Sequence, residues 1–158
     1  MQRPMKRPEQ SYSEQIQIVL SSDINGYHRL FGGRLLEWID MVAGITGRRY
    51  CGTEVTTAAI DKLDFLTAAK LGDILEIIGK VTYVGNTSFE VKVETYVDRQ
   101  NGERERINRA YLVMVALDEE ERSIRPPRLV LQNDEERLEY EAAEQRYLAR
   151  KKARAAAK

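Results

Sequence analysis

The sequence of 158 residues contains very little cysteine and histidine, with one residue of each. Its single cysteine, Cys51, cannot form an intramolecular disulfide, and this composition is typical of a reducing compartment. Structural zinc sites need several cysteine, histidine or carboxylate ligands, so we expect no metal site. The 25 basic residues balance the 25 acidic residues, and this lack of net charge argues against a nucleic-acid-binding protein.

Long hydrophobic runs are also missing. No stretch approaches the ~20 apolar residues that span a bilayer, and the N-terminal sequence MQRPMKRPEQ lacks the apolar core of a secretory signal. We therefore expect a soluble, cytoplasmic protein with no membrane partner. The length suits a single domain, which we divide into a flexible tail at residues 1–10, a folded domain at 11–130 and a charged helix at 131–158.

Alternating polarity, β-forming residues and an apolar run together predict five strands. The first covers residues 15–20, where Ile16, Ile18 and Leu20 are expected on the buried face. Four more follow in hairpin succession at residues 54–66, 73–85, 87–99 and 106–118. The strand at 87–99 is the clearest, because its apolar and charged residues separate onto opposite faces, with Phe89, Val91, Val93, Thr95 and Val97 on one and Glu90, Lys92, Glu94 and Asp98 on the other.

A helical pattern at residues 34–49 separates the first strand from the rest. Its apolar residues occur on nearly all sides, which predicts a buried helix. Gly44 and Gly47 suggest close packing against another backbone, and Gly52 is a plausible stop signal. One helix and one antiparallel sheet make an α+β arrangement. Because one sheet covers only one side of the helix, a symmetric dimer is the economical way to cover the other.

A second helix is expected between residues 133 and 158, which contain no glycine or proline. Acidic residues precede basic ones, as the helix dipole favours, and Asn133 or Asp134 can cap the start. The apolar stripe is thin, so we expect a mostly solvated helix; its members are Leu138, Ala142, Gln145 and Leu148.

The candidate chemistry lies between residues 23 and 44. Gly32 and Gly33 place unhindered N–H groups at a helix start, where a developing oxyanion is stabilised. The alternative is a tight entry into the helix that needs glycine for its backbone. Asp40 falls among apolar residues of the helix. A buried carboxylate is costly, so Asp40 is either a general base or nucleophile, or a member of a buried ion pair or hydrogen bond.

Two further polar residues precede the glycines. Asn25 is able to orient a water or donate to a carbonyl group, or it serves only the Asn-Gly turn. His28 is close enough in sequence to act as an acid or base, although a lone histidine in a loop is more often simply exposed.

These residues resemble the signature of the hotdog-fold acyl-CoA hydrolases, in the run Asn25, Phe31-Gly32-Gly33 and Asp40. The similarity covers residues 15–118 and includes LFGGRLLEWIDMVAG, VTTAAIDKLDFL, the GD of LGDIL, and VGNTS. It implies a hotdog fold, with a long helix wrapped by a five- to six-stranded antiparallel sheet. It also implies a homodimer with the two sheets joined edge to edge, commonly assembled further as a trimer of dimers, a hexamer.

The resemblance further implies hydrolysis of a fatty or short acyl-CoA at the dimer interface, with coenzyme A as part of the substrate and no cofactor. Asp40 of one protomer and Asn25 of the other match the catalytic positions, and the amide of Gly33 stabilises the oxyanion. The remaining candidates for substrate contacts are Phe31, Gly32, Thr87 and Ser88, with Arg48, Arg49, Lys62 and Arg104 for the phosphates.

Three departures from the family affect the acyl-chain preference. His28 stands where a glycine is usual, Thr67-Ala68 replaces Lys-Pro, and Asp64 replaces a neutral residue. Two other roles stay open. A non-catalytic acyl-CoA sensor needs the pocket but not Asp40, and a dehydratase acting on acyl thioesters needs a catalytic histidine, for which only His28 is available.

Overall fold

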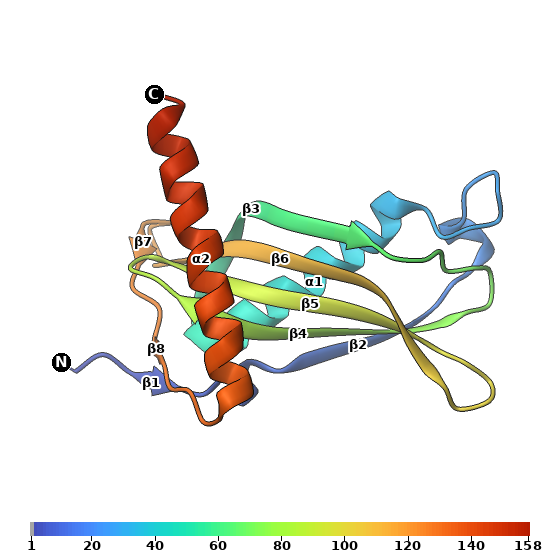
Figure 1. Ribbon diagram of the computed structural model, residues 1–158, viewed down its shortest axis with the longest axis horizontal. Coiled ribbons are helices and arrows are strands. Elements are labelled where there is room, and N and C mark those ends of the chain that lie inside the picture. Colours follow the sequence, from blue (N-terminus) through green and yellow to red (C-terminus); the bar gives the residue numbers. More distant parts are fainter. Residues whose placement is uncertain (1) are drawn as a thin grey trace.

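The computed structural model describes residues 2–158 and shows one long helix wrapped by a curled antiparallel sheet (Figure 1). The main sheet has six strands, in the order β2-β4-β5-β6-β3 with β7 paired to the end of β6. This architecture confirms the predicted α+β class and sheet size. In chain order the elements are β1 (Met5–Lys6), the 3-10 helix η1 (Pro8–Ser11), β2 (Ser13–Ile18), the 3-10 helix η2 (Ser21–Asp23), α1 (Gly32–Cys51), β3 (Glu54–Phe65), β4 (Ile74–Val84), β5 (Ser88–Asp98), β6 (Arg104–Leu117), β7 (Ser123–Ile124), β8 (Arg128–Leu129) and α2 (Asp134–Ala156).

The inner face of the sheet packs on α1 and forms the core. Phe89, Val91 and Val93 of β5 are almost fully buried there, as their alternation predicts. Ile39 and Val42 meet them from the helix. Each large apolar side chain buried in this way contributes ~1.5–3 kcal/mol to the stability of the fold.

Two glycines determine how closely α1 approaches the sheet. A Cβ atom added to Gly79 of β4 would lie 2.4 Å from Oγ1 of Thr46 in the helix. A Cβ atom on Gly47 would lie 3.0 Å from the ring of Phe89. Gly47 is therefore closely packed, but against the side chains of Phe89 and Val55 and not against another backbone as expected, whereas a Cβ atom on Gly44 would have no atom within 4 Å.

The helix boundaries lie slightly outside the predicted range. α1 begins at Gly32 and ends at Cys51, two residues beyond the expected helix at each end. Gly52 terminates it in the left-handed conformation, with φ of 71°, and donates its N–H to Arg48 O at 2.8 Å. The predicted stop signal is thus confirmed.

The prediction that α1 is buried on all sides is wrong for a single chain. Met41 and Ile45 are 55% and 43% exposed, although Trp38 is only 7% exposed. Asp40 is exposed as well. The reason is geometric, because the sheet covers one side of the helix and nothing else within residues 2–158 covers this side.

The face of β2 that was expected to be buried is also the exposed one. Ile16 and Ile18 are 53% and 52% exposed and Leu20 beyond the strand is 56% exposed, while the neighbouring Val19 is fully buried. Alternation identifies the two faces of a strand but not which face packs against the helix. In β2 the face with Gln15 and Gln17 is the more buried one.

The segment expected to be a flexible tail makes contacts in its described part. Met5–Lys6 pair in parallel with β8, and Pro8 and Ser11 are buried. The Ser11 hydroxyl accepts a hydrogen bond from Val81 N at 2.9 Å. Met1 lies outside the described residues. Two-residue pairing of this kind leaves no periodic signal in a polar sequence.

The C-terminal helix α2 crosses the outer face of its own sheet (Figure 1). Asn133 caps it as predicted, because its side chain accepts a hydrogen bond from Glu136 N at 2.8 Å. The predicted apolar stripe is not the packed side, since Leu138 and Leu148 are 67% and 46% exposed.

Tyrosines and an alanine form the packed side of α2 instead. The rings of Tyr140 and Tyr147 lie 4.9 Å and 5.5 Å from the ring of Tyr83 in β4, measured between centroids. Ala143 between them is fully buried. Tyrosine has an apolar ring although it ends in a polar hydroxyl group. A search for aliphatic residues at helical spacing therefore misses this packed surface.

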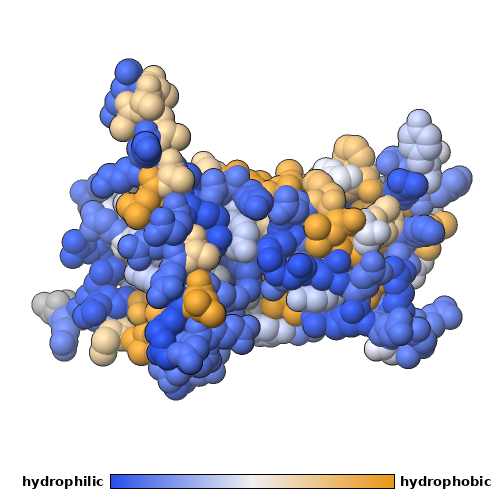
Figure 2. All heavy atoms as spheres, in the orientation of Figure 1, coloured by the Kyte–Doolittle hydropathy of each residue, from blue (hydrophilic) through white to orange (hydrophobic). Residues whose placement is uncertain are grey.

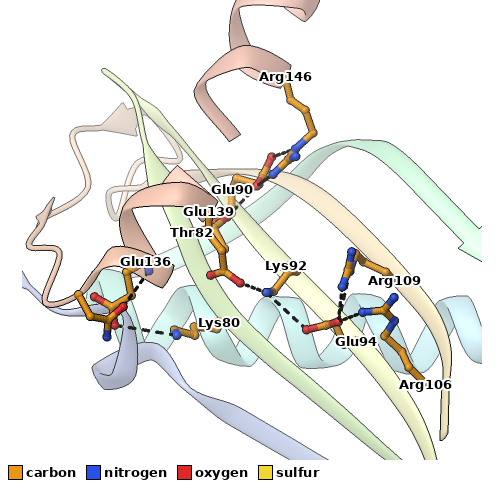
Figure 3. A network of polar contacts seen from close by, with 11 residues as sticks. Lys80, Thr82, Glu90, Lys92, Glu94, Arg106, Arg109, Glu136, Glu139 and Arg146 are labelled. Atoms are coloured by element: carbon orange, nitrogen blue, oxygen red, sulfur yellow. Dashed lines mark hydrogen bonds and ion pairs between the residues drawn. The ribbon is translucent and has the colours of Figure 1, made fainter. Parts of the chain in front are cut away.

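Charged groups hold the rest of α2 to the sheet (Figure 3). Arg146 donates two hydrogen bonds to Glu90, at 2.9 Å and 2.8 Å, and Glu90 is only 1% exposed. Thr82 donates a further hydrogen bond to Glu90 at 2.7 Å, and the Arg146 guanidinium lies 3.7 Å from the centre of the Tyr111 ring. The neighbouring ion pairs are Lys92 with Glu139 and Glu94, Glu94 with Arg106 and Arg109, Lys80 with Glu136, and Arg150 with Asp61.

Candidate active site

A cavity of about 300 Å³ opens beside the N-terminal end of α1. A mostly apolar wall with a few polar groups is typical of small-molecule sites. Two of the predicted site residues, Asn25 and Gly32, border this cavity. The other lining residues come from the loop before the helix, from α1, from the end of β3 and the segment after it, and from β6; they are Arg29, Leu30, Leu35, Phe65, Leu66, Thr67, Ala68, Ala69 and Ile107.

Asn25 has its side-chain oxygen engaged and its amide nitrogen available. The oxygen accepts hydrogen bonds from the N–H groups of Tyr27 and Arg29, at 2.9 Å and 3.3 Å. Within residues 2–158 the side-chain nitrogen has no hydrogen-bond acceptor. The turn-forming role and the donor role are therefore compatible, since they use different atoms of the same amide.

His28 occupies the tip of this loop in a left-handed conformation, with φ of 60°. Its N–H donates to Asn25 O at 3.1 Å and its side chain is exposed. Glycine adopts this conformation without the steric cost that other residues incur. Histidine in place of the usual glycine therefore has a steric cost in the backbone of this turn.

The two glycines at the start of α1 differ in how much space a side chain would have. A Cβ atom on Gly33 would lie 2.6 Å from Cε1 of Phe31, whereas one on Gly32 would lie 3.8 Å from the nearest atom, in Phe65. Neither glycine has a positive φ, so the helix entry does not need them for its backbone. No side chain caps the helix, and the N–H groups of both glycines lack acceptors in the part of the chain that is described. These amides are available to a ligand.

Asp23 fixes the loop against the helix. Its carboxylate accepts a hydrogen bond from Leu20 N at 2.9 Å and pairs with Arg34 at 3.2 Å. Its carbonyl oxygen accepts the N–H of Phe31 at 2.8 Å. The sequence pattern did not single out this residue, because an aspartate in a polar turn is ordinary.

Asp40 lies on the exposed side of α1, which corrects the expectation of a buried carboxylate. The Thr57 hydroxyl of β3 donates a hydrogen bond to its Oδ1 at 2.7 Å. Asp40 does not border the cavity, and eight residues of helix place it ~12 Å along the axis from Gly32. One chain therefore does not bring Asn25 and Asp40 together. Thr57 escaped notice because threonine is also an ordinary strand residue.

The candidate phosphate-binding arginines are mostly engaged within the chain. Arg49 donates to Tyr12 O at 2.9 Å, and Arg48 pairs with Glu54 at 3.4 Å. Arg104 pairs with Glu76 at 2.8 Å.

The other candidates lie apart from the cavity. Lys62 is exposed on β3, 4.0 Å from Asp64. Thr87 and Ser88 follow the β4–β5 turn, at the opposite end of the sheet from the start of α1 (Figure 1). Burial raises the pKa of the Cys51 thiol to about 12, which keeps it from serving as a thiolate nucleophile.

Neither helix within residues 2–158 is long and apolar enough to cross a membrane. Over the same residues, no three histidine, cysteine or acidic side chains cluster closely enough to hold a metal ion.

A long helix wrapped by one curled antiparallel sheet defines this protein as a hotdog-fold protein. The model of the thioesterase superfamily matches residues 27–102. A Bacillus subtilis protein named as an uncharacterized acyl-CoA thioester hydrolase, YkhA, is 35% identical over 93% of this chain and 89% of its own length. The chain therefore belongs to the acyl-CoA thioester hydrolase family. The human cytosolic acyl coenzyme A thioester hydrolase is 32% identical over 94% of this chain, which spans only 41% of that longer protein.

Solved structures agree with this assignment. A Staphylococcus aureus acyl-CoA hydrolase variant in complex with coenzyme A superposes with a TM-score of 0.93 at 36% identity, covering 99% of this chain and 94% of that one. A hexameric acyl-CoA thioesterase gives a TM-score of 0.91 at 37% identity, with 96% and 98% of the two chains covered. Alanine variants of the S. aureus enzyme at an asparagine, an aspartate and a threonine have been solved, and Asn25, Asp40 and Thr57 have the same spacing here.

Proposed function

We propose that this chain hydrolyses acyl-CoA thioesters, releasing a free acid and coenzyme A, at a site shared between two copies. The observation that carries the proposal is the Asp40 carboxylate, which is held by the Thr57 hydroxyl on a side of α1 that one chain leaves uncovered. The S. aureus relative has been solved with butyryl coenzyme A, which is a ligand of this class.

The free edge of β3 supports the shared site. Among residues 2–158, β3 is a terminal strand of the sheet and pairs only with β6. Hydrophobic atoms gather along the upper border of the outer face, over β3 (Figure 2). A long, partly apolar edge strand invites pairing with a second copy. Pairing of two β3 strands would cover the exposed side of α1 and bring Asp40 of one copy toward the cavity of the other.

In the proposed reaction each group has one task. Asp40 either activates a water molecule that adds to the thioester carbonyl and displaces the coenzyme A thiolate, or attacks the carbonyl itself, displacing the thiolate and forming an anhydride that water then hydrolyses. Asn25 of the second copy donates its free amide N–H to the carbonyl or the water. The amide of Gly33 stabilises the negative charge that develops on the carbonyl oxygen, and one such donor is worth ~10²–10³ in rate.

A subunit-mixing experiment tests the shared site. Asn25→Ala and Asp40→Ala proteins are each expected to be inactive in release of free coenzyme A. After subunit exchange, mixed dimers carry one intact site and recover part of the activity. Exchange that is verified by mass spectrometry but restores nothing would rule out the cross-chain arrangement.

A substrate panel tests the reaction itself. We expect the purified chain to release free coenzyme A from acyl-CoA substrates of several lengths, with no cofactor added and no effect of a metal chelator. Tight binding of acyl-CoA without thiol release would instead identify the chain as a sensor. Hydration or dehydration of the acyl group would instead identify the chain as a dehydratase that acts on acyl thioesters.

A further inference from the structure

Another cavity, of about 200 Å³, lies where the N-terminal segment, β8 and the first half of α2 meet (Figure 1). It is named here the arginine cavity, and its lining residues are Arg3, Val84, Arg128, Leu129 and Tyr140. Among residues 2–158, no acidic side chain lines it. Because one water molecule takes ~30 Å³ of liquid, the arginine cavity has room for a small anion together with a few waters.

Backbone pairing brings the two arginines to this cavity. Met5 of β1 is the parallel partner of Arg128 in β8, and Arg128 N donates to Pro4 O at 2.8 Å. Arg3 precedes this pairing, and its side-chain Nε donates to Pro126 O at 2.7 Å. The segments that carry the two arginines are therefore fixed side by side, and the positive charges border one cavity as a result of the fold.

The positive charge of the arginine cavity is not neutralised by the chain. Within residues 2–158 neither Arg3 nor Arg128 pairs with a carboxylate, in contrast to Arg146 of α2, which pairs with Glu90. Nη2 of Arg3 is buried and has no hydrogen-bond acceptor among these residues. An unsatisfied buried donor is costly, and two neighbouring positive charges repel each other. An anion bound between the arginines relieves both costs.

Tyr140 adds a third donor to the cavity. Burial, together with the negative charge of Glu144, raises the pKa of Tyr140 above its ordinary value, so its hydroxyl stays protonated and can donate a hydrogen bond. Guanidinium groups match the geometry of phosphate oxygens and bind them with two parallel hydrogen bonds. A phosphate group suits three donor residues better than a carboxylate, since it offers more acceptor oxygens and more negative charge.

We propose that the arginine cavity binds a free phosphate-class anion, either inorganic phosphate or a small phosphate monoester, which joins the N-terminal segment and β8 to α2. The cavity lies toward the C-terminal end of α1, where the Tyr50 hydroxyl donates to Pro127 O at 2.9 Å. Tyr50 is ~27 Å along the helix axis from Gly32, which borders the active-site cavity of the same chain. The inference therefore does not depend on the proposed function.

Titration calorimetry with inorganic phosphate, at an ionic strength held constant with sodium chloride, tests the site. The parent chain is expected to bind one phosphate per chain. The Arg3→Gln/Arg128→Gln variant should bind it about ten-fold more weakly or worse, because hydrogen bonds to charged groups are lost. The matched control is Arg7→Gln/Arg137→Gln, which removes the same charge from two arginines that already pair with carboxylates, and it should bind as the parent does.

A single-atom change tests the same site with little risk to the fold. Tyr140→Phe keeps the ring that packs on Tyr83 and removes only the hydroxyl, so phosphate affinity should fall ~2–10-fold. Circular dichroism checks folding, and this variant decides alone if the double arginine variant does not fold. The proposal is overturned by a parent chain that shows no saturable binding, by a control that weakens as much as the arginine variant, or by unchanged affinity in Tyr140→Phe.

The phosphates of an acyl-CoA substrate share this chemistry, and kinetics distinguish the two sources. In phosphate-free buffer, the KM for acyl-CoA is expected to be the same for the parent and the Arg3→Gln/Arg128→Gln variant, which assigns the site to a free anion. A KM that rises about as much as the phosphate affinity falls would assign the arginines to the substrate and overturn the proposal. Failure of the proposed function would appear separately, as a parent chain that binds phosphate but releases no coenzyme A.

Discussion

At the scale of single residues, the hydrogen bond between Thr57 and Asp40 orients the carboxylate that we place at the centre of the reaction. A hydrogen bond to a charged group is worth ~1.5–3 kcal/mol. We therefore expect Thr57→Val to lower kcat about ten-fold or more, since 1.4 kcal/mol corresponds to a factor of ten. Thr57→Ser keeps the hydroxyl and should recover most of the loss. Steady-state thiol release measures both variants, and equal kcat values for valine and serine would contradict the positioning role.

The two glycines at the start of α1 provide a matched pair. A Gly33→Ala methyl group would lie 2.6 Å from the Phe31 ring, but this ring is 58% exposed and can turn aside, so the free energy of unfolding should change by less than ~1 kcal/mol. The Gly32→Ala methyl group has space, so its free energy of unfolding should change by less than ~0.5 kcal/mol. Urea unfolding of the two variants gives the comparison. Alanine keeps the backbone N–H at position 33, so a greater loss of activity in Gly33→Ala than in Gly32→Ala would come from the added methyl group crowding the substrate, and not from loss of the oxyanion donor.

At the scale of elements, α2 depends on a buried ion pair. Arg146→Ala leaves the Glu90 carboxylate uncompensated at 1% exposure, which costs ~3–5 kcal/mol. The control is Arg137→Ala, which breaks an exposed pair with Asp134 on the same helix and should cost less than ~1 kcal/mol. Denaturant unfolding measures both. Similar changes in the free energy of unfolding for the two variants would mean that the Glu90 carboxylate is not stabilised by Arg146.

The charged face under α2 also predicts how stability depends on pH. Burial alone would raise the pKa of Glu94, but Lys92, Arg109 and Arg106 hold it below its ordinary value. A lowered folded-state pKa stabilises the fold above the unfolded value of ~4.3, and this contribution is lost as the pH falls through the folded-state pKa. Stability of the parent chain should therefore decline below pH ~4, and Glu94→Gln should show a smaller decline. An identical acid profile for the variant would exclude this carboxylate as a source of the dependence.

Periodicity predicted the helices and the main strands of this chain because each has a regular pattern. It failed where a choice between two faces had to be made. β2 alternates cleanly, yet the side with Ile16 and Ile18 is the exposed one. In α2 the packed side uses Tyr140 and Tyr147 in place of the leucines. Both errors have one physical cause, since amphipathicity reports that two sides differ and not what each side meets.

At the scale of the whole molecule, the exposed side of α1 should control assembly. Met41→Glu/Ile45→Glu places charges on the side that we expect a second copy to cover. Burying unpaired charge at an interface costs several kcal/mol, so the variant should sediment as a monomer and lose activity. A variant that remains dimeric and active would show that this side of the helix stays open to solvent. The control is Leu138→Lys/Leu148→Lys, which places two charges on exposed positions of α2 and should leave assembly and activity unchanged.

The candidate site was only partly predictable from the sequence. Asn25, Gly33 and Asp40 stand out because a turn, a helix start and a charged residue among apolar ones are local signals. Thr57 is seventeen residues beyond Asp40 and meets it only because β3 returns beside α1. The intrachain partners of the candidate arginines could not be predicted for the same reason, since the contacts of Arg49 and Arg104 are with residues distant in sequence.

The tight approach at Gly79 has a consequence for the chemistry at the other end of the helix. Thr46, which a larger residue at Gly79 would displace, and Asp40 belong to one rigid rod and lie ~9 Å apart along its axis. A larger residue at position 79 would push α1 away from β4 and tilt the helix. The Asp40 carboxylate and the free N–H groups at the start of α1 would then move together. Gly79 of β4, which is not part of the proposed active site, thereby determines how the reacting groups on α1 are aligned.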